Sequence, residues 1–389
     1  MFSASRFSQL LKFIPRATFS SAVQRSQADR YAKKVGSWDL LVTLLFGQLT
    51  QAKSLRSLAV TSQALQADHY HLNAKPLSRS TLCDALQKRS PEPFKVLCQL
   101  LIAQAARKQR REVEAMINLI DSTCITLRGP RFDGWTLANK TRITQGLKIH
   151  IGLDAQQAAP IYANITAANI NDVSDAWEMP IEKGVTYVFD KGYCDYNWWH
   201  RIEQAGSIFV TRLKKNANVK SVRALPNANV TAAIESDEAI LFNKKTLNVK
   251  RPNFYFGKEL RRVRVRRDGD AASLVLITND FKRSAQEIAD LYKQRWQVEL
   301  FFKWIKQHLK LKQYFGASEN AVRLQIYSAL IAFLLLGAYR RHSAATESLF
   351  EFSAHLACSL FERPQARQRT AERRRTQDQI KINMGSLQL

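Results

Sequence analysis

The spacing of apolar positions divides the chain into a helical first part and a mixed second part. Apolar residues recur every three or four positions in WDLLVTLLFGQL (38–49) and FKVLCQLLIAQAA (94–106). This period predicts mostly helical structure from residue 1 to about residue 110. Within it, LSRSTLCDALQKR (77–89) has a serine start signal and predicts a short basic amphipathic helix. Such a helix is similar to the second helix of a helix-turn-helix, although an ordinary surface helix has the same pattern.

Between residues 112 and 215 the pattern changes to short apolar runs rich in β-branched residues. Three strands are predicted first, and helices then alternate with strands. This order suits an α/β protein with a ribonuclease H-like mixed sheet, preceded by an all-helical domain. The predicted elements are strands at 115–127, 145–153 and 159–166, a helix at 172–178, a strand at 185–190, a helix at 195–205 and a strand at 207–213.

Two of the predicted strands carry a carboxylate. Asp121 lies in the middle of AMINLIDSTCITL, and Asp190 ends the apolar run of GVTYVFDKGYCD, where Gly192 lets the backbone turn. A single carboxylate at a strand end is common and needs no functional explanation. Together with Glu299 far downstream, however, they form an Asp…Asp…Glu set. Three converging carboxylates repel one another, so they are tolerated mainly where divalent cations neutralise them.

Glu299 belongs to a spaced group of polar residues in LYKQRWQVELFFKWIKQHLKL (291–311). On one continuous α-helix, Tyr292, Arg295 and Lys306 project within about 40° of Glu299. Lys303 and Lys310 fall on the same stripe, and apolar residues fill much of the remaining circumference. This is typical of a helix that lines an active site. The alternative is a solvated face with a glutamate flanked by cations.

The Asp–Asp–Glu set combined with Y-x2-R-x3-E-x6-K resembles the insertion-sequence transposases of the DDE class that carry the Y-R-E-K signature. The resemblance covers most of the chain. Further blocks that resemble this family are DSTCITL around Asp121, GLKIHIGLD (146–154), DKGYCD (190–195) and FVTRLKKNA (209–217). Near the N-terminus, FSQLLKFIP, SLRSL and RSTLCDALQKR resemble its helical leader domain.

The resemblance implies a site and a reaction. Asp121, Asp190 and Glu299 become the ligands of two Mg²⁺ ions, which Mn²⁺ could replace. Tyr292, Arg295 and Lys306 become contacts to DNA phosphates, and Lys303 lies beside them on the stripe. The implied enzyme binds the inverted repeats of its element, cuts the DNA and transfers a strand to target DNA, with at least a homodimer joining the two ends. A catalytically inactive repressor and a related nuclease remain as alternatives.

The resemblance and the composition shifts together suggest five segments. They are a helical DNA-binding domain (1–110), the first part of the ribonuclease H-like core (111–215), a β-rich insertion (216–280), the core helix with Glu299 (281–345) and a basic tail (346–389).

In the insertion, Arg262, Arg264 and Arg266 share one strand face. We expect them to contact phosphates, although a solvated edge strand would look the same. Related transposases capture a flipped base with a tryptophan in such an insertion. This chain has none between residues 200 and 295, which leaves Tyr255 or Phe256 as substitutes.

Composition agrees with a DNA partner. Lys and Arg number 59 against 33 Asp and Glu, a net charge of +26. Such an excess favours polyanions, including double-stranded DNA, through counterion release. The longest apolar run, ALIAFLLLGAY (329–339), is too short for a bilayer and predicts a core helix rather than a membrane contact.

The cysteines and the N-terminus bear on location. Five scattered cysteines without a C-x-x-C pair indicate a reduced cytosolic chain without a zinc site or disulfide framework. The resemblance implies that this is a bacterial cytoplasm and that the protein associates with the nucleoid. The Ser- and Arg-rich N-terminus also imitates a mitochondrial transit peptide, an alternative that the resemblance disfavours. Three polar residues are interpreted as structural: His150 as a satisfied sheet residue, and Asp172 and Asp175 as helix-capping residues.

Overall fold

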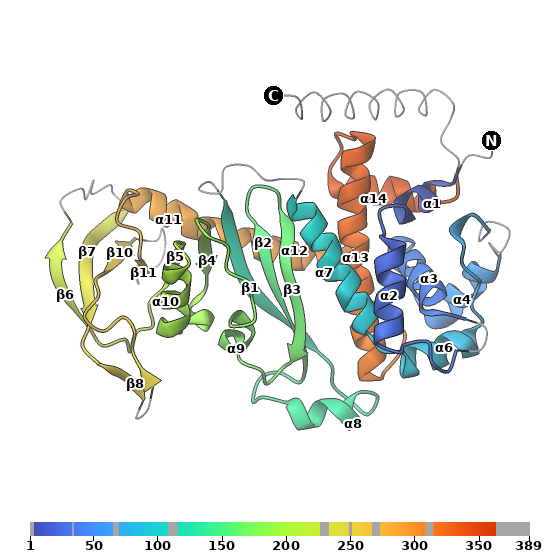
Figure 1. The fold of residues 1–389 in the computed structure, drawn as a ribbon, viewed down its shortest axis with the longest axis horizontal. Helices are drawn as coiled ribbons and strands as arrows, with labels where there is room; N and C mark the ends of the chain where they lie inside the picture. The colour runs from blue at the N-terminus through green and yellow to red at the C-terminus, as the bar shows by residue number, and fades with distance from the viewer. Residues whose placement is uncertain are drawn as a thin grey trace. The chain divides into compact units, whose positions relative to one another are not determined.

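The computed structural model describes residues 4–32, 35–64, 70–107, 116–225, 233–248, 251–266, 273–308 and 314–362. The chain forms two compact units (Figure 1). One combines Met1–Leu101 with Ile305–Leu389, and the other is Ile102–Trp304. Each unit is described by itself.

The first unit is helical, as the apolar period predicts for the N-terminal part. Its described elements, with two that cross its boundaries, are α1 (Arg6–Leu11), α2 (Arg16–Arg25), α3 (Ser37–Leu49), α4 (Leu55–Ala64), η1 (Tyr70–Leu72), α6 (Arg79–Lys88), α7 (Glu92–Arg107), α12 (Trp296–His308), α13 (Glu319–Ser343) and α14 (Leu349–Cys358). The predicted start of α6 is confirmed, because the Ser78 hydroxyl accepts a hydrogen bond from the Thr81 N–H.

The long helix α13 forms the core of this unit. It contacts α1, α3, α6 and α14, so segments from both ends of the sequence share one core. Among the described helices, α13 has the length and apolar composition of a membrane span, which corrects the expectation that no segment reaches this length. However, 83% of its apolar window is buried inside the protein. It is therefore a core helix, as ALIAFLLLGAY predicts.

The second unit is built on a nine-stranded sheet with the order β3-β2-β1-β4-β5-β11-β10-β7-β6 (Figure 1). Its strands are β1 (Ile117–Thr126), β2 (Gly146–Asp154), β3 (Ala159–Ala167), β4 (Thr186–Phe189), β5 (Ile208–Arg212), β6 (Val219–Ala224), β7 (Ile234–Phe242), β10 (Leu260–Val265) and β11 (Leu274–Thr278). A short hairpin, β8 (Thr246–Asn248) with β9 (Arg251–Pro252), stands apart. The helical segments of this unit are α8 (Asp133–Thr136), η3 (Leu137–Asn139), α9 (Asp172–Ala176), η4 (Lys191–Tyr193), α10 (Tyr196–Gln204) and α11 (Ala285–Gln294).

The first five strands confirm the predicted fold class. β1, β2 and β3 form an antiparallel meander, while β4 and β5 run parallel to β1. This is the mixed sheet of a ribonuclease H-like α/β fold. The predicted strands match the observed ones to within two residues at each end.

The strands that follow residue 216 extend this same sheet. β11 pairs antiparallel with β5, joining Thr211 to Ile277, and β10, β7 and β6 continue outward. A buried ion pair fixes this extension, because Arg261 donates to both oxygens of Asp237 at 2.8 and 2.7 Å. The segment is thus continuous with the first five strands by backbone hydrogen bonding.

Helices cover both faces of the sheet where β4 and β5 lie. On one face, α10 contributes Trp198, Trp199 and Ile202 to an aromatic core with Phe189 and Phe209. The strand residues that alternate with these two phenylalanines, including Val188 and Val210, are buried as well. Side chains alternate across a strand, so they face the opposite side, and α11 contacts the same two strands.

The region that carries the polar stripe is two helices rather than one. α11 begins with a capping box formed by Ser284 and Glu287 and ends at Gln294, and α12 begins at Trp296. Arg295 is the turn residue between them. The prediction of one continuous helix is therefore wrong at this residue, and Leu309 and Lys310 lie outside the described residues.

Candidate active site

Three carboxylates from three separate segments lie near enough for their charges to interact. The register of the parallel pair β1–β4 joins Ile120 to Phe189, so the residues that follow, Asp121 and Asp190, are neighbours at the end of β4. Glu299 enters from the first turn of α12. Mutual repulsion affects Asp121, whose pKa is raised in part by the charges of both other acids.

Arg295 links two of these acids directly. Its Nη1 donates to Asp121 Oδ2 at 2.8 Å, and its Nη2 donates to Glu299 Oε1 at 2.7 Å. The third acid is held by a neighbour on α11, because the Tyr292 hydroxyl donates to Asp190 Oδ1 at 3.1 Å. The last turn of α11 and the turn residue that follows it therefore supply a partner to each of the three acids.

Burial shapes the electrostatics of this group. It raises the pKa of Asp121 to about 6, against the opposing charge of Arg295. Burial and the charge of Asp190 raise the pKa of Tyr292 to about 12, so the phenol stays protonated and can donate. Burial opposes the charge of Arg295, yet its pKa is raised because the hydrogen bond to Glu299 and the nearby anions outweigh that effect. The guanidinium is a permanent cation among these acids.

Arg212, at the end of β5, is a neighbour that the sequence interpretation missed. Its Nη1 lies 3.6 Å from Asp190 Oδ1. β4 and β5 are parallel neighbours, so the ends of both strands meet at one edge of the sheet. The block FVTRLKKNA, with its cation at a predicted strand end, was the signal that could have identified it.

The donor chemistry of the site fits a divalent metal ion. Carboxylate oxygens are the preferred ligands of Mg²⁺, and the three acids offer them from rigid elements. Over the part of the chain that the structure describes, no three His, Cys, Asp or Glu side chains are grouped closely enough to hold a metal. Here the guanidinium of Arg295 takes part of the charge balance that a metal ion would supply.

The other residues predicted to contact phosphates lie further along α12 and on or beside β10. Lys303 is exposed and Lys306 is half-buried, one and two turns beyond Glu299 on α12. On β10, Arg262 pairs with Glu238 at 2.8 Å. The neighbouring Arg264 is exposed, and Arg266 lies 3.6 Å from Glu235. Their contacts to DNA remain predictions.

Of the two aromatic candidates for base capture, one is eliminated. Tyr255 is fully buried in the core behind β5. Phe256 is 40% exposed, and Lys245 Nζ lies 5.6 Å from its ring centroid. Of these two side chains, Phe256 is the one that is accessible from solvent, and base capture by it remains a prediction.

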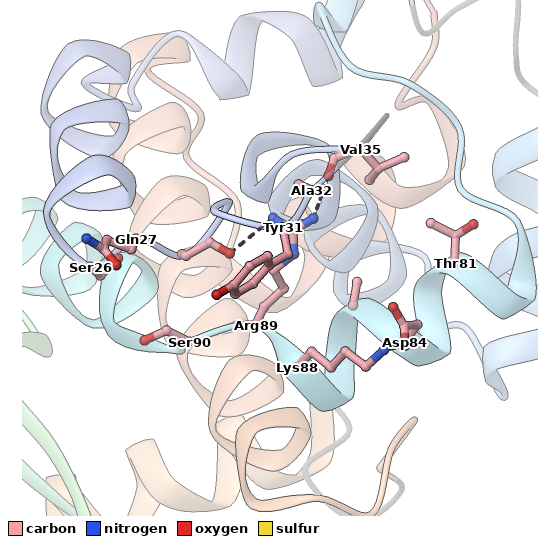
Figure 2. A pocket seen from close by; sticks show the side chains of 12 residues that line it. Ser26, Gln27, Tyr31, Ala32, Val35, Thr81, Asp84, Lys88, Arg89 and Ser90 are labelled. Atoms are coloured by element: carbon pink, nitrogen blue, oxygen red, sulfur yellow. Dashed lines mark hydrogen bonds and ion pairs between the residues drawn. The ribbon is translucent and has the colours of Figure 1, made fainter.

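A hollow of about 770 Å³ lies beside α6 in the helical unit (Figure 2). Arg89 crosses it, donating to the carbonyl oxygens of Ala28 at 3.4 Å and Val35 at 2.5 Å and pairing with Asp29. The guanidinium of Arg89 thus has its partners within the protein. In contrast, Arg79 at the start of α6 is exposed.

Comparisons with known proteins agree on one family. Residues 114–335 match the family described as the transposase DDE domain, and residues 3–75 match a domain of unknown function, DUF4372. A protein of Sinorhizobium fredii named as a transposase, y4zB, is 41% identical over 292 residues, covering 74% of this chain and 79% of that protein. A protein of Geobacillus stearothermophilus named as the transposase for insertion sequence element IS5377 is 28% identical over 302 residues, covering 77% and 75%.

A solved structure supports the fold. The cryo-EM structure of the piggyBac transposase synaptic complex with hairpin DNA has a TM-score of 0.52 to this chain at 13% identity. The match covers 96% of this chain and 82% of that one. At this identity the similarity concerns the fold.

Proposed function

Because the chain belongs to the DDE transposase family, whose members use divalent metal ions to cut DNA and transfer strands, we propose that Asp121, Asp190 and Glu299 are its metal ligands. The ions would be two Mg²⁺, with Mn²⁺ able to replace them. The observation that carries this proposal is the bridge from Arg295 to Asp121 and Glu299. Partly buried acids need a compensating charge, and here Arg295 supplies it where a metal ion could do so.

In this proposal the metal ions supply activation of the attacking oxygen and stabilisation of the leaving oxygen. The chain supplies the positions. β1 and β4 are adjacent strands covered by helices, so the two aspartates are fixed by the sheet, while α12 brings Glu299 from outside it. Tyr292 holds Asp190 by one oxygen and leaves the other available.

In this proposal Arg295 has two kinds of partner, the carboxylates of Asp121 and Glu299 and a DNA phosphate. Without DNA it balances Asp121 and Glu299, and we propose that it turns to a phosphate once metal ions take over these carboxylates. A guanidinium suits both tasks, because it remains charged and its donors match carboxylates and phosphates equally. Tyr292, Arg212 and Lys306 would contact the same strand near the cut.

Binding of the DNA ends would come from several basic segments. We propose that the exposed face of α6, the basic residues Arg262, Arg264 and Arg266, and Lys303 contact phosphates of the element ends and of target DNA. A homodimer would hold two ends at once, and binding would place the protein at the bacterial nucleoid.

The test is a cleavage and joining assay with the purified chain. A duplex that carries the inverted repeat next to its reading frame is incubated with Mg²⁺ and a supercoiled target plasmid. We expect strand cuts at the repeat boundary, followed by joining of the freed 3′ ends to the plasmid. Binding without cutting would support the repressor alternative, and cutting without joining would support the nuclease alternative.

A further inference from the structure

A polar cluster lies behind Asp121, on the opposite face of the sheet. Successive side chains of a strand point to opposite faces, so Ser122 faces away from Asp121. Ser122 pairs in register with His150 of β2, which pairs with Asn164 of β3. These three polar residues line up across strands that are otherwise mainly apolar. α9 supplies the acids Asp172 and Asp175 to the same cluster.

Asp172 is at the centre of this cluster, and its role differs from helix capping. The cap of α9 is Asn171, whose side chain accepts from the Val173 N–H. Instead, Asp172 Oδ1 accepts a hydrogen bond from Ser122 Oγ at 2.8 Å and an ion pair from Lys148 Nζ at 3.0 Å. Lys148 also donates to the carbonyl of Ile170 at 2.8 Å, which anchors the chain just before α9.

The two oxygens of Asp172 lie against residues that neighbour two different candidate metal ligands, Ser122 beside Asp121 and Gly192 two residues after Asp190. Through Oδ1 it holds Ser122, whose backbone N–H donates to Asp121 Oδ1 at 2.8 Å. Its Oδ2 faces Gly192, where an added Cβ would lie only 3.2 Å away. Gly192 is two residues after Asp190, in the η4 turn that Asp190 begins. The glycine is therefore explained by the close approach of a carboxylate.

We propose that Asp172 is a positioning residue that sets Asp121 and Asp190 relative to each other for metal binding, through Ser122 on one side and the Gly192 turn on the other. This inference rests on the proposed function, because it assumes that the two aspartates bind metal. Groups behind the ligands of a metal site orient those ligands, and their loss costs about 10- to 100-fold in metal affinity or activity.

The charges of the cluster support this role. His150 is buried, and burial lowers its pKa to about 4, so it is neutral at physiological pH. Lys148 is then the cation that balances Asp172. Asp175 is engaged separately, since it accepts from Asn164 Nδ2 at 2.6 Å. Asp172 and Asp175 therefore have different partners, Ser122 and Lys148 for the first and Asn164 for the second.

The experiment measures Mn²⁺ binding to the full chain without DNA, by titration calorimetry, beside thermal unfolding. We expect Asp172→Ala and Ser122→Ala each to weaken Mn²⁺ binding about 10-fold or more. Ser122→Thr keeps the hydroxyl and should restore wild-type binding. Asp175→Asn is the matched control, one turn further along α9: it should lower the unfolding temperature and leave Mn²⁺ affinity unchanged.

The outcomes distinguish failure of the positioning role from failure of the proposed metal site. If Asp190→Ala and Glu299→Ala weaken Mn²⁺ binding but Asp172→Ala and Ser122→Ala do not, the positioning role is wrong and the proposed site stands. If none of the four weakens binding, the proposed site itself is wrong and this inference falls with it. Equal effects of the Asp172 and Asp175 variants would reduce the cluster to a structural role. Should Asp172→Ala not fold, Asp172→Asn and Ser122→Ala decide the question in its place.

Discussion

The Nη1 nitrogen of Arg295 lies 2.8 Å from the Oδ2 oxygen of Asp121, so a permanent cation of the protein rests against a carboxylate assigned to metal binding. The same guanidinium reaches Glu299. On the proposed assignment, metal ions and Arg295 would compete for the same two acids, and this competition can be measured.

Arg295→Gln should destabilise the metal-free protein by about 1–3 kcal/mol, because two charge-assisted hydrogen bonds are lost and two acids face each other unpaired. Added Mn²⁺ should then raise the unfolding temperature of the variant more than that of the wild type. Thermal melts with and without Mn²⁺ check this. End cleavage should also fall more than DNA binding in a gel-shift. Lys293→Gln, an exposed cation of α11, is the control for both measurements.

We expect Asp121→Ala, Asp190→Ala and Glu299→Ala each to reduce strand cleavage of an end-containing duplex by more than about 100-fold. Loss of a group that only orients a metal ligand lowers activity by up to about 100-fold, so loss of a ligand itself should lower it further. Binding to the ends should persist, because affinity comes from many Lys and Arg residues. Robust cleavage by any one variant would remove that residue from the site.

Asp195→Ala serves as the control for this series, with one expected side effect. Asp195 caps α10 by accepting from the Trp198 N–H at 2.9 Å and pairs with Arg251. Its loss should therefore cost about 1 kcal/mol of stability, measured by urea unfolding, while cleavage by the folded protein continues.

The contribution of His150 to the free energy of unfolding should fall as pH drops from about 6.5 toward 4, against the opposite contribution of Asp121, whose pKa is raised to about 6. The pKa of buried His150 is lowered to about 4, so the unfolded chain takes up this proton first and acid favours unfolding. Lys148, Asp172 and Asp175 face the ring, and the raised pKa of Asp175 contributes with the opposite sign. Comparing His150→Gln with the wild type isolates the contribution of the histidine, which is up to about 3 kcal/mol of the free energy of unfolding.

Urea unfolding at several pH values between 4 and 7 checks this expectation. An equal slope for the wild type and His150→Gln would show that His150 does not drive acid sensitivity.

Arg79 begins α6 and Arg89 follows its last residue. We expect substitution of Arg79 to affect DNA binding and substitution of Arg89 to affect stability. Arg79→Ala removes an exposed cation and should weaken end binding, with the slope of log affinity against log salt reduced by about 1. Arg89→Ala instead leaves Asp29 and two carbonyl groups without their donor, so it should lower the unfolding temperature (Figure 2). Gel-shifts at several salt concentrations and thermal melts distinguish them. A salt slope unchanged by Arg79→Ala would exclude this helix from the DNA interface.

Local sequence patterns predicted the central strands well, because an apolar, β-branched run between turn residues is a local signal. The same runs placed Asp121 on the first predicted strand and Asp190 at the end of the fourth, and the structure shows that these two strands are neighbours. The break at Arg295 could not be predicted, since no Gly or Pro lies in LYKQRWQVEL to mark it. Spacing along a helix still identified Tyr292, Arg295 and Glu299, since one turn residue shifts the stripe without dispersing it.

Pairings between distant residues were beyond the sequence interpretation. Nothing local indicates that β11 joins β5, or that Arg261, beside the expected arginine face, would be buried against Asp237. Asp172 was assigned to capping because an acid after Asn171 is a common helix start. Its contact with Ser122 spans fifty residues and depends on the sheet register.

The pairing of β5 with β11 also constrains the order in which the enzyme can mature on the ribosome. Everything between Arg212 and Leu274 must be synthesised before β11 can close this edge, and α11 then docks on β4, β5, β7 and β10. Closing so long a loop is slow compared with forming local contacts. A nascent chain thus presents both aspartates well before Glu299 and Arg295 join them. On the proposed assignment, the complete set of three acids is available only after the chain has been synthesised as far as Glu299 in α12.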